Sequence, residues 1–296
     1  MARSSKPEPR LRTAVEIAGD RVVAARANAS GNIIEAVSVR TLPAGVVTPN
    51  LSAENVHDIQ TVSNAVRDAL DAVGARQREV SLIMPDASSR IALLDFDTLP
   101  ERRQDAEGIV RFRLKKSLPF DVDRAAVSYE TQSNNGKIRV VAAVAQQSVL
   151  NEYESVVREA GRTPGMVLPA VVAALGTVDT SRPRLVLNVE PGTTTLVIVD
   201  QDELLLYRNL EYAGAPRAEQ LADDVYPSVV FFEDTYGMKI DRILVGGIPL
   251  ETVASALEEA SGVRVQELVG ASVFGPAADS GAQRERLAGV VGALIG

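Results

Sequence analysis

The chain has 296 residues, of which 46% are hydrophobic, so it can bury a large core as one large domain or two lobes. The net charge of −8 and the low aromatic content of 4% argue against a nucleic-acid partner. There is no cysteine and only one histidine, His57, which excludes disulfides, thiolate metal sites, cysteine nucleophiles and histidine-rich metal sites.

The ends of the chain and its apolar runs bear on localisation. Residues 1–10 are polar and are interpreted as a flexible tail, because they lack the apolar centre of a signal peptide. No apolar run approaches the roughly 20 residues that a membrane-spanning helix needs. We therefore expect a cytoplasmic protein.

Residues 11–89 are predicted to form the first part of a first lobe. Residues 13–42 predict three strands, because apolar runs are separated by turn residues at 18–20 and 28–32. Residues 54–75 carry apolar side chains at helical spacing and predict an amphipathic helix that ends at Gly74. His57 lies off this apolar stripe and is predicted to be a surface residue. Residues 79–85 predict a buried strand.

Residues 90–163 are predicted to form an inserted α+β module. The order is strand, charged helix around 101–117, strand, a turn at 133–136, strand, and a helix that ends at Gly161. The basic run at 111–116 is interpreted as a solvated face, with contact to an acidic lipid or partner as the alternative. Residues 164–184 are predicted to return to the first lobe through a linker and an apolar helix.

Residues 185–284 are predicted to form a second lobe that repeats the first. The strand–turn–strand "LVLNVEPGTTTLVIVD" aligns with residues 13–28, placing Glu16 over Asn188 and Ala18 over Glu190. A helix at 218–237 follows, which Pro227 should kink or begin. Next come a strand, a Gly246-Gly247 turn, a helix to Gly262 and a loop at 277–283. Residues 285–296 predict a terminal helix that packs on the first lobe. Two facing hairpins could clamp a phosphate chain.

The order of a hairpin, an inserted module, a hairpin with "GTTT", and "ILVGG" before a helix resembles the actin-like ATPase superfamily. Within it, "RFRLKKSLPFDVDRAAVSYE" and "RVVAAVAQQSVLNEYESVVREAG" resemble the PilM-type type IV pilus assembly proteins, which are related to FtsA. The resemblance implies an α/β fold of duplicated, ribonuclease H-like lobes with an inserted SHS2 module.

The resemblance also implies a site for ATP and Mg²⁺ formed by Gly19, Gly192, Thr193, Thr194, Gly246 and Gly247. The family pattern has an aspartate where Asn188 stands, a glycine where Glu190 stands, and a lysine near Val23. These changes remove an anion that would hold Mg²⁺, add a carboxyl group at the phosphate and remove a counter-charge. We therefore expect a degenerate site that binds ATP and Mg²⁺ weakly or not at all, with no catalytic residue and no metal ligand.

The function that the resemblance implies is that of a scaffold at the cytoplasmic face of the inner membrane, which it reaches only through its partners. Those partners would be the N-terminal segment of a PilN-like membrane protein and other pilus assembly components. A groove between the first lobe and the module would hold the segment in an extended form. Candidate walls are the strand at 79–85 and the turn with Leu118, Pro119 and Phe120, although core packing explains these three residues equally well.

Three alternatives stay open at this point. The chain could be a nucleotide-binding ATPase or small-molecule kinase in which Glu16 positions water or accepts a proton. It could also be a cytoplasmic L-type component of type II secretion, which has a similar fold. Self-association is open too, although the sequence shows no long exposed apolar patch that would favour filaments.

Overall fold

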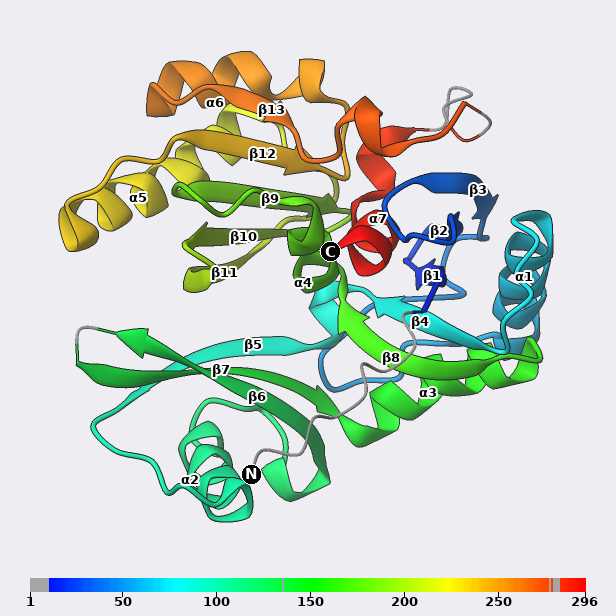
Figure 1. Cartoon of the computed structure of the whole chain (residues 1–296), viewed down its shortest axis with the longest axis horizontal. Helices are drawn as coiled ribbons and strands as arrows, with labels where there is room; N and C mark the ends of the chain where they lie inside the picture. The colour runs from blue at the N-terminus through cyan, green and yellow to red at the C-terminus, as the bar shows by residue number, and fades with distance from the viewer. Residues whose placement is uncertain (1–10, 135, 277, 279–282) are drawn as a thin grey trace.

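Two sheets of the same strand order form the two lobes. The computed structural model describes residues 11–134, 136–276, 278 and 283–296. The first sheet has the order β3-β2-β1-β4-β8, formed by Ile34–Thr41, Arg21–Ala27, Thr13–Ile17, Glu79–Met84 and Thr163–Pro169. The second has the order β11-β10-β9-β12-β13, formed by Glu203–Glu211, Thr193–Asp200, Arg184–Glu190, Arg242–Gly246 and Val265–Glu267. Figure 1 shows helix α7 (Ala288–Ile295) between the two lobes.

The hairpins that begin the two sheets correspond in register. Glu16 of β1 is paired in parallel with Ile83 of β4, and Asn188 of β9 is paired in the same way with Gly246 of β12. Each hairpin partner strand, β2 or β10, runs antiparallel to the first. The predicted repeat is therefore confirmed, including its alignment of Glu16 with Asn188.

One face of the first sheet is covered by helices α1 (Ile59–Ala72) and α3 (Gln147–Glu159). Asp58 caps α1 by accepting a hydrogen bond from the Thr61 amide, which satisfies one of the free N–H groups of its first turn. The buried residues of α3 include Tyr153 and Val156 and belong to the same core. The sequence analysis placed this helix in the module. Its apolar stripe predicts a packed helix but carries no information about which sheet it covers.

Strand β8 replaces the linker and part of the apolar helix that were predicted within residues 164–184. Only the short helix α4 (Ala170–Ala174) and the 3₁₀ turn η3 (Leu175–Thr177) follow it. Pro164 and Pro169 concealed the strand, because proline lacks the N–H that an inner strand requires. Since β8 is the outer strand of its sheet and pairs with β4 on one side, it tolerates both prolines.

The module is an antiparallel sheet with one helix. Its strands have the order β5-β7-β6, formed by Arg90–Phe96, Lys137–Gln146 and Ala125–Asn134. Helix α2 (Arg103–Leu114) buries Val110 and Leu114 against one face of this sheet, and the 3₁₀ turn η2 (Val122–Arg124) adds Val122. Position 135 of the predicted turn at 133–136 lies outside the described residues. In Figure 1 the module lies below the second lobe.

The second lobe carries helices α5 (Ala218–Tyr236) and α6 (Ala254–Ser261), with the 3₁₀ turn η4 (Leu250–Thr252) before α6. Pro227 lies inside α5 rather than in its first turn, on the solvent side of the helix. At that position water can bind the carbonyl group that proline leaves without a donor. Two further 3₁₀ turns, η5 (Ala271–Val273) and η6 (Arg284–Arg286), precede α7.

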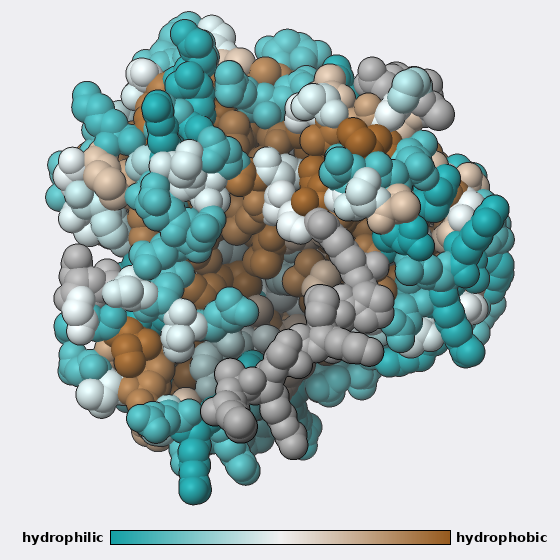
Figure 2. All heavy atoms as spheres, viewed as in Figure 1, coloured by the Kyte–Doolittle hydropathy of each residue, from teal (hydrophilic) through white to brown (hydrophobic). Residues whose placement is uncertain are grey.

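A shared hydrophobic core joins the lobes. It contains Val23 and Ala25 of β2, Val186 of β9, and Val290 and Val291 of α7. Figure 2 shows hydrophobic side chains gathered in the hollow centre of this face, where the lobes and the module meet. The predicted loop at 277–283 lies outside the described residues except for Ala278 and Gln283. In the described ranges, no helix combines the length and the hydrophobicity of a membrane span.

Candidate functional site

A cluster of charged residues lies where the two hairpins face each other, and all of its members are buried except Asp20, whose side chain is 41% exposed. We call Glu16, Asp20, Arg21, Asp86 and Glu190 the charged cluster. The Arg21 side chain is 6% exposed, and its guanidinium lies 3.4 Å from Glu16 Oε1 and 2.8 Å from Asp20 Oδ1. The other Asp20 oxygen lies 3.6 Å from Nη1 of Arg286, in the segment that leads to α7. The first hairpin thus carries its own cation at the turn.

Asp86 connects the first lobe to the second. It lies in the 3₁₀ turn η1 (Asp86–Ser88), directly after β4, and is fully buried. One of its carboxylate oxygens accepts a hydrogen bond from the Val171 amide of α4, at 2.9 Å. The other accepts one from Nδ2 of Asn188, also at 2.9 Å. Asn188 therefore donates its amide proton to a protein carboxylate across the interface between the lobes.

Burial changes the acidity of these carboxyl groups. Desolvation raises the pKa of Glu16 from 4.5 to about 7, although the Arg21 cation opposes this change. Desolvation also raises the pKa of Asp86, and it raises that of Glu190 well above its usual value, with Asp86 and Glu16 adding repulsion. Burial by itself lowers the pKa of Arg21, but the Glu16 and Asp20 carboxyl groups outweigh this effect and raise the pKa above its usual value. Arg21 therefore stays positively charged. The sequence analysis placed the Glu190 carboxyl group at the phosphate position, and its buried surroundings, by raising its pKa, favour the protonated form of that group.

The Gly246-Gly247 turn is surrounded by protein backbone. Gly247 has φ 88°, a conformation that favours glycine, and its amide donates to the Glu285 carbonyl at 2.6 Å. A Cβ atom at Gly247 would lie 1.8 Å from the Val189 carbonyl oxygen of β9. Close packing of β9 and the segment before α7 therefore explains why a glycine is needed here.

Two predicted site residues line an open cleft between the lobes. Gly192 and Thr193 contribute to a cleft of about 730 Å³ whose other lining residues are Pro49, Asn50, Leu51, Ser52, Ala87, Ser89, Arg90, Ile91, Tyr207, Arg208, Asn209, Glu211 and Tyr212. Gly19 lies beside this cleft, because a Cβ atom there would contact Pro49 at 3.4 Å. Thr194 is fully buried in β10. The structure thus brings Gly19, Gly192 and Thr193 near one cleft, while Gly246 and Gly247 are not among its lining residues.

The three predicted partner-binding residues lie between α2 and η2. Leu118 and Phe120 are half-buried and pack against the core of the module, together with Leu114. Pro119 is exposed. The packing of Leu118 and Phe120 follows the alternative of core residues that the sequence left open. His57, predicted to be a surface residue, is exposed and contacts Thr48.

Two members of the site were missed in the sequence. Asp86 follows a buried strand directly, and an acid at such a strand end is a signal that could have been used. Arg286 contacts Asp20 across more than half the chain, and no local pattern indicates that contact.

Comparison with solved structures identifies the fold. A chain of a PilM–PilN type IV pilus biogenesis complex has 17% identity and a TM-score of 0.82, with 97% of this chain and 98% of that one covered. The chain therefore has the actin-like fold. This agrees with the predicted fold class.

Two further structures share this fold at lower similarity. The ethanolamine utilization protein EutJ of Carboxydothermus hydrogenoformans has 12% identity and a TM-score of 0.55, with 98% of this chain and 92% of that one covered. The cytoplasmic domain of EpsL, an inner-membrane component of the type II secretion system of Vibrio cholerae, has 10% identity and a TM-score of 0.50, with 88% and 98% covered. No protein-family model and no curated protein sequence matches the chain.

Proposed function

We propose that this protein is a cytoplasmic scaffold of a type IV pilus machine, peripheral to the inner membrane. It binds the short N-terminal cytoplasmic segment of a PilN-like inner-membrane protein. The observation that carries this proposal is the TM-score of 0.82 to a chain of a PilM–PilN complex, over 97% of this chain and therefore including the module. The EutJ and EpsL structures reach only 0.55 and 0.50.

The charged cluster supports a scaffold whose nucleotide site is degenerate. A phosphate beside the first hairpin would meet Asp20 there, and Arg21 already pairs with Glu16 and Asp20. As an enzyme, the protein would need Glu16 to reach water or substrate. Instead, Glu16 Oε2 packs so closely against Gly289 of α7 that a Cβ atom there would lie 2.6 Å away. Asn188 is likewise occupied by Asp86 rather than free to hold a hydrated metal ion.

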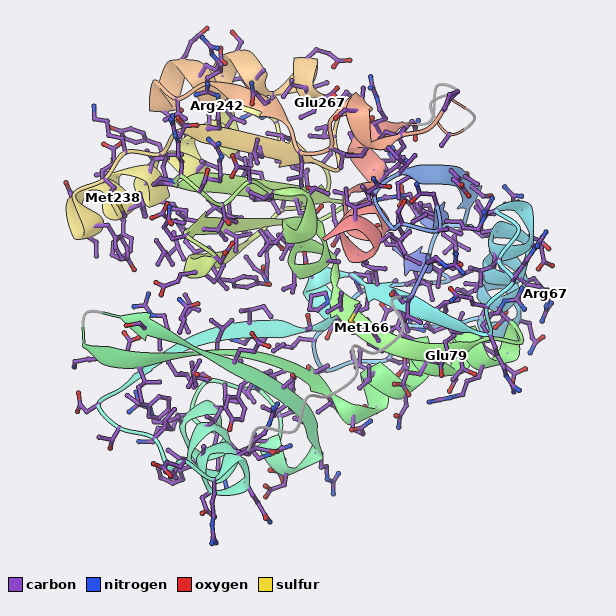
Figure 3. The ribbon with its side chains drawn as sticks, viewed as in Figure 1. Arg67, Glu79, Met166, Met238, Arg242 and Glu267 are labelled. Carbon is purple, nitrogen blue, oxygen red and sulfur yellow. The ribbon has the colours of Figure 1, made fainter. Side chains whose placement is uncertain are left out.

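We place the partner segment on the outer edge of β8. The predicted wall at 79–85 is β4, which lies inside the sheet between β1 and β8 and is buried except for Glu79. β8 is the outer strand on the side of the module (Figure 1). Met166, on β8, is 41% exposed and is labelled in Figure 3. An extended segment could pair with the β8 backbone and lay an apolar side chain on Met166.

Titration calorimetry of the full chain with a synthetic PilN-like cytoplasmic segment tests this proposal. We expect binding that the Met166→Ser variant weakens about tenfold, because an apolar contact worth about 1.4 kcal/mol is lost. Met238→Ser is the matched control, since Met238 is 36% exposed and lies beyond the end of α5 (Figure 3). Absence of binding to the wild-type chain would contradict the scaffold, whereas equal binding by Met166→Ser would contradict the β8 site alone.

Calorimetry and an ATP turnover assay separate the scaffold from the alternative functions. When the chain is titrated with Mg-ATP, we expect no heat of binding. The protein concentration should be about tens of micromolar, the range in which such titrations detect weak binding. ATP turnover that Glu16→Gln abolishes would favour an ATPase or kinase instead. Binding of a type II secretion segment in preference to the PilN-like one would favour the L-type component.

A further inference from the structure

Arginine side chains gather at one edge of the first sheet. β1, β4 and β8 are parallel and begin at this edge, and β2, which is antiparallel to β1, ends there. The arginines of these strand ends and the segments beside them are Arg12, Arg26, Arg76, Arg78 and Arg162. The acidic residues that pair with these arginines or begin one of the strands are Glu35, Asp71 and Glu79, the last of which is labelled in Figure 3. Arginines therefore outnumber these carboxylates here, although the whole chain has a net charge of −8.

A pocket of about 400 Å³ opens among three of these arginines. Its walls include Arg12, Arg26, Arg76 and Gln77, and none of the described residues that line it is acidic. The Arg12 amide donates to Oε1 of Gln77 at 3.0 Å. That contact leaves the side-chain N–H groups of Gln77 available to another acceptor.

Arg26 is already used by the fold. Its Nε donates to the Val73 carbonyl at the end of α1, at 2.7 Å, and its Nη1 pairs with Glu35 Oε2 at 2.6 Å. The carbonyl groups at the end of a helix repel an anion, so the contact with Val73 also shields the pocket from that repulsion. The Glu35 side chain is 42% exposed. An anion in the pocket can therefore compete with this solvated carboxylate for the Arg26 guanidinium.

Arg12 and Arg76 have no corresponding structural task. Both are exposed, and neither side chain forms an ion pair or a hydrogen bond within the part of the chain that the structure describes. A guanidinium group presents a planar fork of N–H donors that matches the oxygen atoms of a phosphate. Two such forks and the N–H donors of Gln77 line the same pocket, which is the composition of a site for an oxyanion.

We propose that this pocket binds a phosphate group. The phosphate oxygens accept hydrogen bonds from Arg12, Arg76 and Gln77, and Arg26 adds a further positive charge. The volume has room for a phosphate with a small polar group attached, such as the glycerol of a phospholipid headgroup. Because the arginines are solvated, a single soluble phosphate binds weakly, with a dissociation constant on the order of 1 mM. Binding this weak would not produce heat in the titration with Mg-ATP.

The phosphate group can come from a lipid headgroup or from a soluble phosphate. A bilayer presents many headgroups to the sheet edge at once, and each arginine near an anionic surface contributes about fivefold to membrane affinity. Arg78, which is exposed directly before β4, would add to that contact. With a lipid source, the protein touches the membrane directly as well as through its partner.

Two variants of the full chain with the same change in charge test the pocket with a soluble probe. The pocket variant carries Arg12→Gln and Arg76→Gln. The control variant carries Arg217→Gln and Arg264→Gln, at exposed positions of the second lobe. Glycerol phosphate is titrated while amide signals are followed by NMR. We expect the Gln77 signal to shift in the wild type and the control, with binding about tenfold weaker or more in the pocket variant.

Sedimentation with vesicles distinguishes the two sources. The vesicles consist of phosphatidylcholine, with or without phosphatidylglycerol. If the source is a lipid headgroup, the wild type and the control variant sediment with phosphatidylglycerol vesicles, the pocket variant binds about tenfold more weakly or less, and added salt releases the chain. If the source is a soluble phosphate, glycerol phosphate shifts the Gln77 signal but the chain stays in the supernatant.

Glu35→Gln provides a gain of binding, which damage to the fold cannot imitate. The change releases Nη1 of Arg26 from its ion pair, while Nε stays on the Val73 carbonyl. We expect glycerol phosphate to bind this variant several-fold more tightly than it binds Glu251→Gln, which removes an exposed carboxylate of the second lobe.

Three outcomes would overturn the proposal. The first is a wild-type chain that binds neither glycerol phosphate nor phosphatidylglycerol vesicles. The second is equal binding by the pocket variant and the control variant, because surface charge in general would then explain the binding. The third is a Glu35→Gln variant that binds no more tightly than Glu251→Gln.

Discussion

Glu16 illustrates how one side chain can keep its place in a fold while its surroundings change its chemistry. It stands at the end of β1, where the superfamily resemblance would place an acid beside a phosphate. Here it is 4% exposed, lies 3.4 Å from Arg21 and packs against α7. Because this carboxyl group is buried, a change in its protonation with pH changes the stability of the fold.

The pH dependence of stability is the first prediction at this scale. The pKa of Glu16 is about 7 in the folded chain against 4.5 for the ordinary group. Between these values the unfolded chain loses a proton that the folded chain keeps, so rising pH lowers the free energy of unfolding. Above pH 7 the loss is complete and amounts to about 3 kcal/mol.

Glu16→Gln removes this dependence. Relative to the wild type, the variant should gain stability between about pH 4.5 and pH 8, as measured by urea unfolding at several pH values. Because the Glu16 charge also raises the pKa of Glu190, the difference between the two proteins includes the part of the Glu190 response that depends on Glu16. Glu79→Gln, at an exposed position on β4, controls for the loss of a surface carboxylate. A difference in stability that does not vary with pH would show that Glu16 is not buried in this way.

Some of the site was predictable from single residues, and some was not. Asn188 and Glu190 stand out in the sequence because they replace residues that a phosphate loop requires, and the repeat aligned them correctly with Glu16 and Ala18. The pairing of Asn188 with Asp86 could not be predicted, because it joins positions that only the folded lobes bring together.

At the scale of elements, the hairpins and α1 were predicted because their hydrophobic periods are unambiguous. β8 was not, since Pro164 and Pro169 are typical of loops, and only its position at a sheet edge permits them. The assignment of α3 failed for a related reason. An amphipathic stripe predicts that a helix packs, but the partner sheet is decided by contacts far away in the sequence.

The junction between the module and the second lobe gives a prediction at this scale. Gln132 of β6 donates through Nε2 to the Leu204 carbonyl at 2.7 Å and accepts from the Leu204 amide at 3.1 Å. The side chain thus occupies part of the free edge of β11. Gln132→Ala should speed hydrogen exchange at the Leu204 amide by about tenfold, because the amide loses its partner.

Gln147→Ala is the matched control for that experiment. Its side chain bonds only to Asn151 at the start of α3, away from β11. An unchanged exchange rate at Leu204 in Gln132→Ala would mean that the module and the second lobe separate freely in solution.

At the scale of the whole molecule, α4 and α7 cross beside the first sheet, within the core that the two lobes share. The crossing is very close, because a Cβ atom at Gly292 would lie 2.0 Å from the Ala173 carbonyl oxygen. Gly292→Ala should therefore lower the free energy of unfolding by about 1–3 kcal/mol or more, since backbone rather than a flexible side chain must shift.

Gly108→Ala is the same chemical change, but we expect it to have the opposite effect on the free energy of unfolding. Gly108 lies in α2 with no atom within 4 Å of an added Cβ, so alanine should stabilise the helix by about 0.5–1 kcal/mol. Thermal unfolding of both variants checks the pair. Equal effects at the two positions would contradict the close crossing.

The contact at Gly292 also limits which parts of the molecule can move. α4 and α7 meet backbone to backbone at this position, and both helices pack mainly on the first sheet. Sliding one helix along the other would drive these atoms together, so we expect the two helices and the first sheet to move as one body. Opening and closing of the cleft beside Gly192 then comes from movement of the second lobe relative to that body.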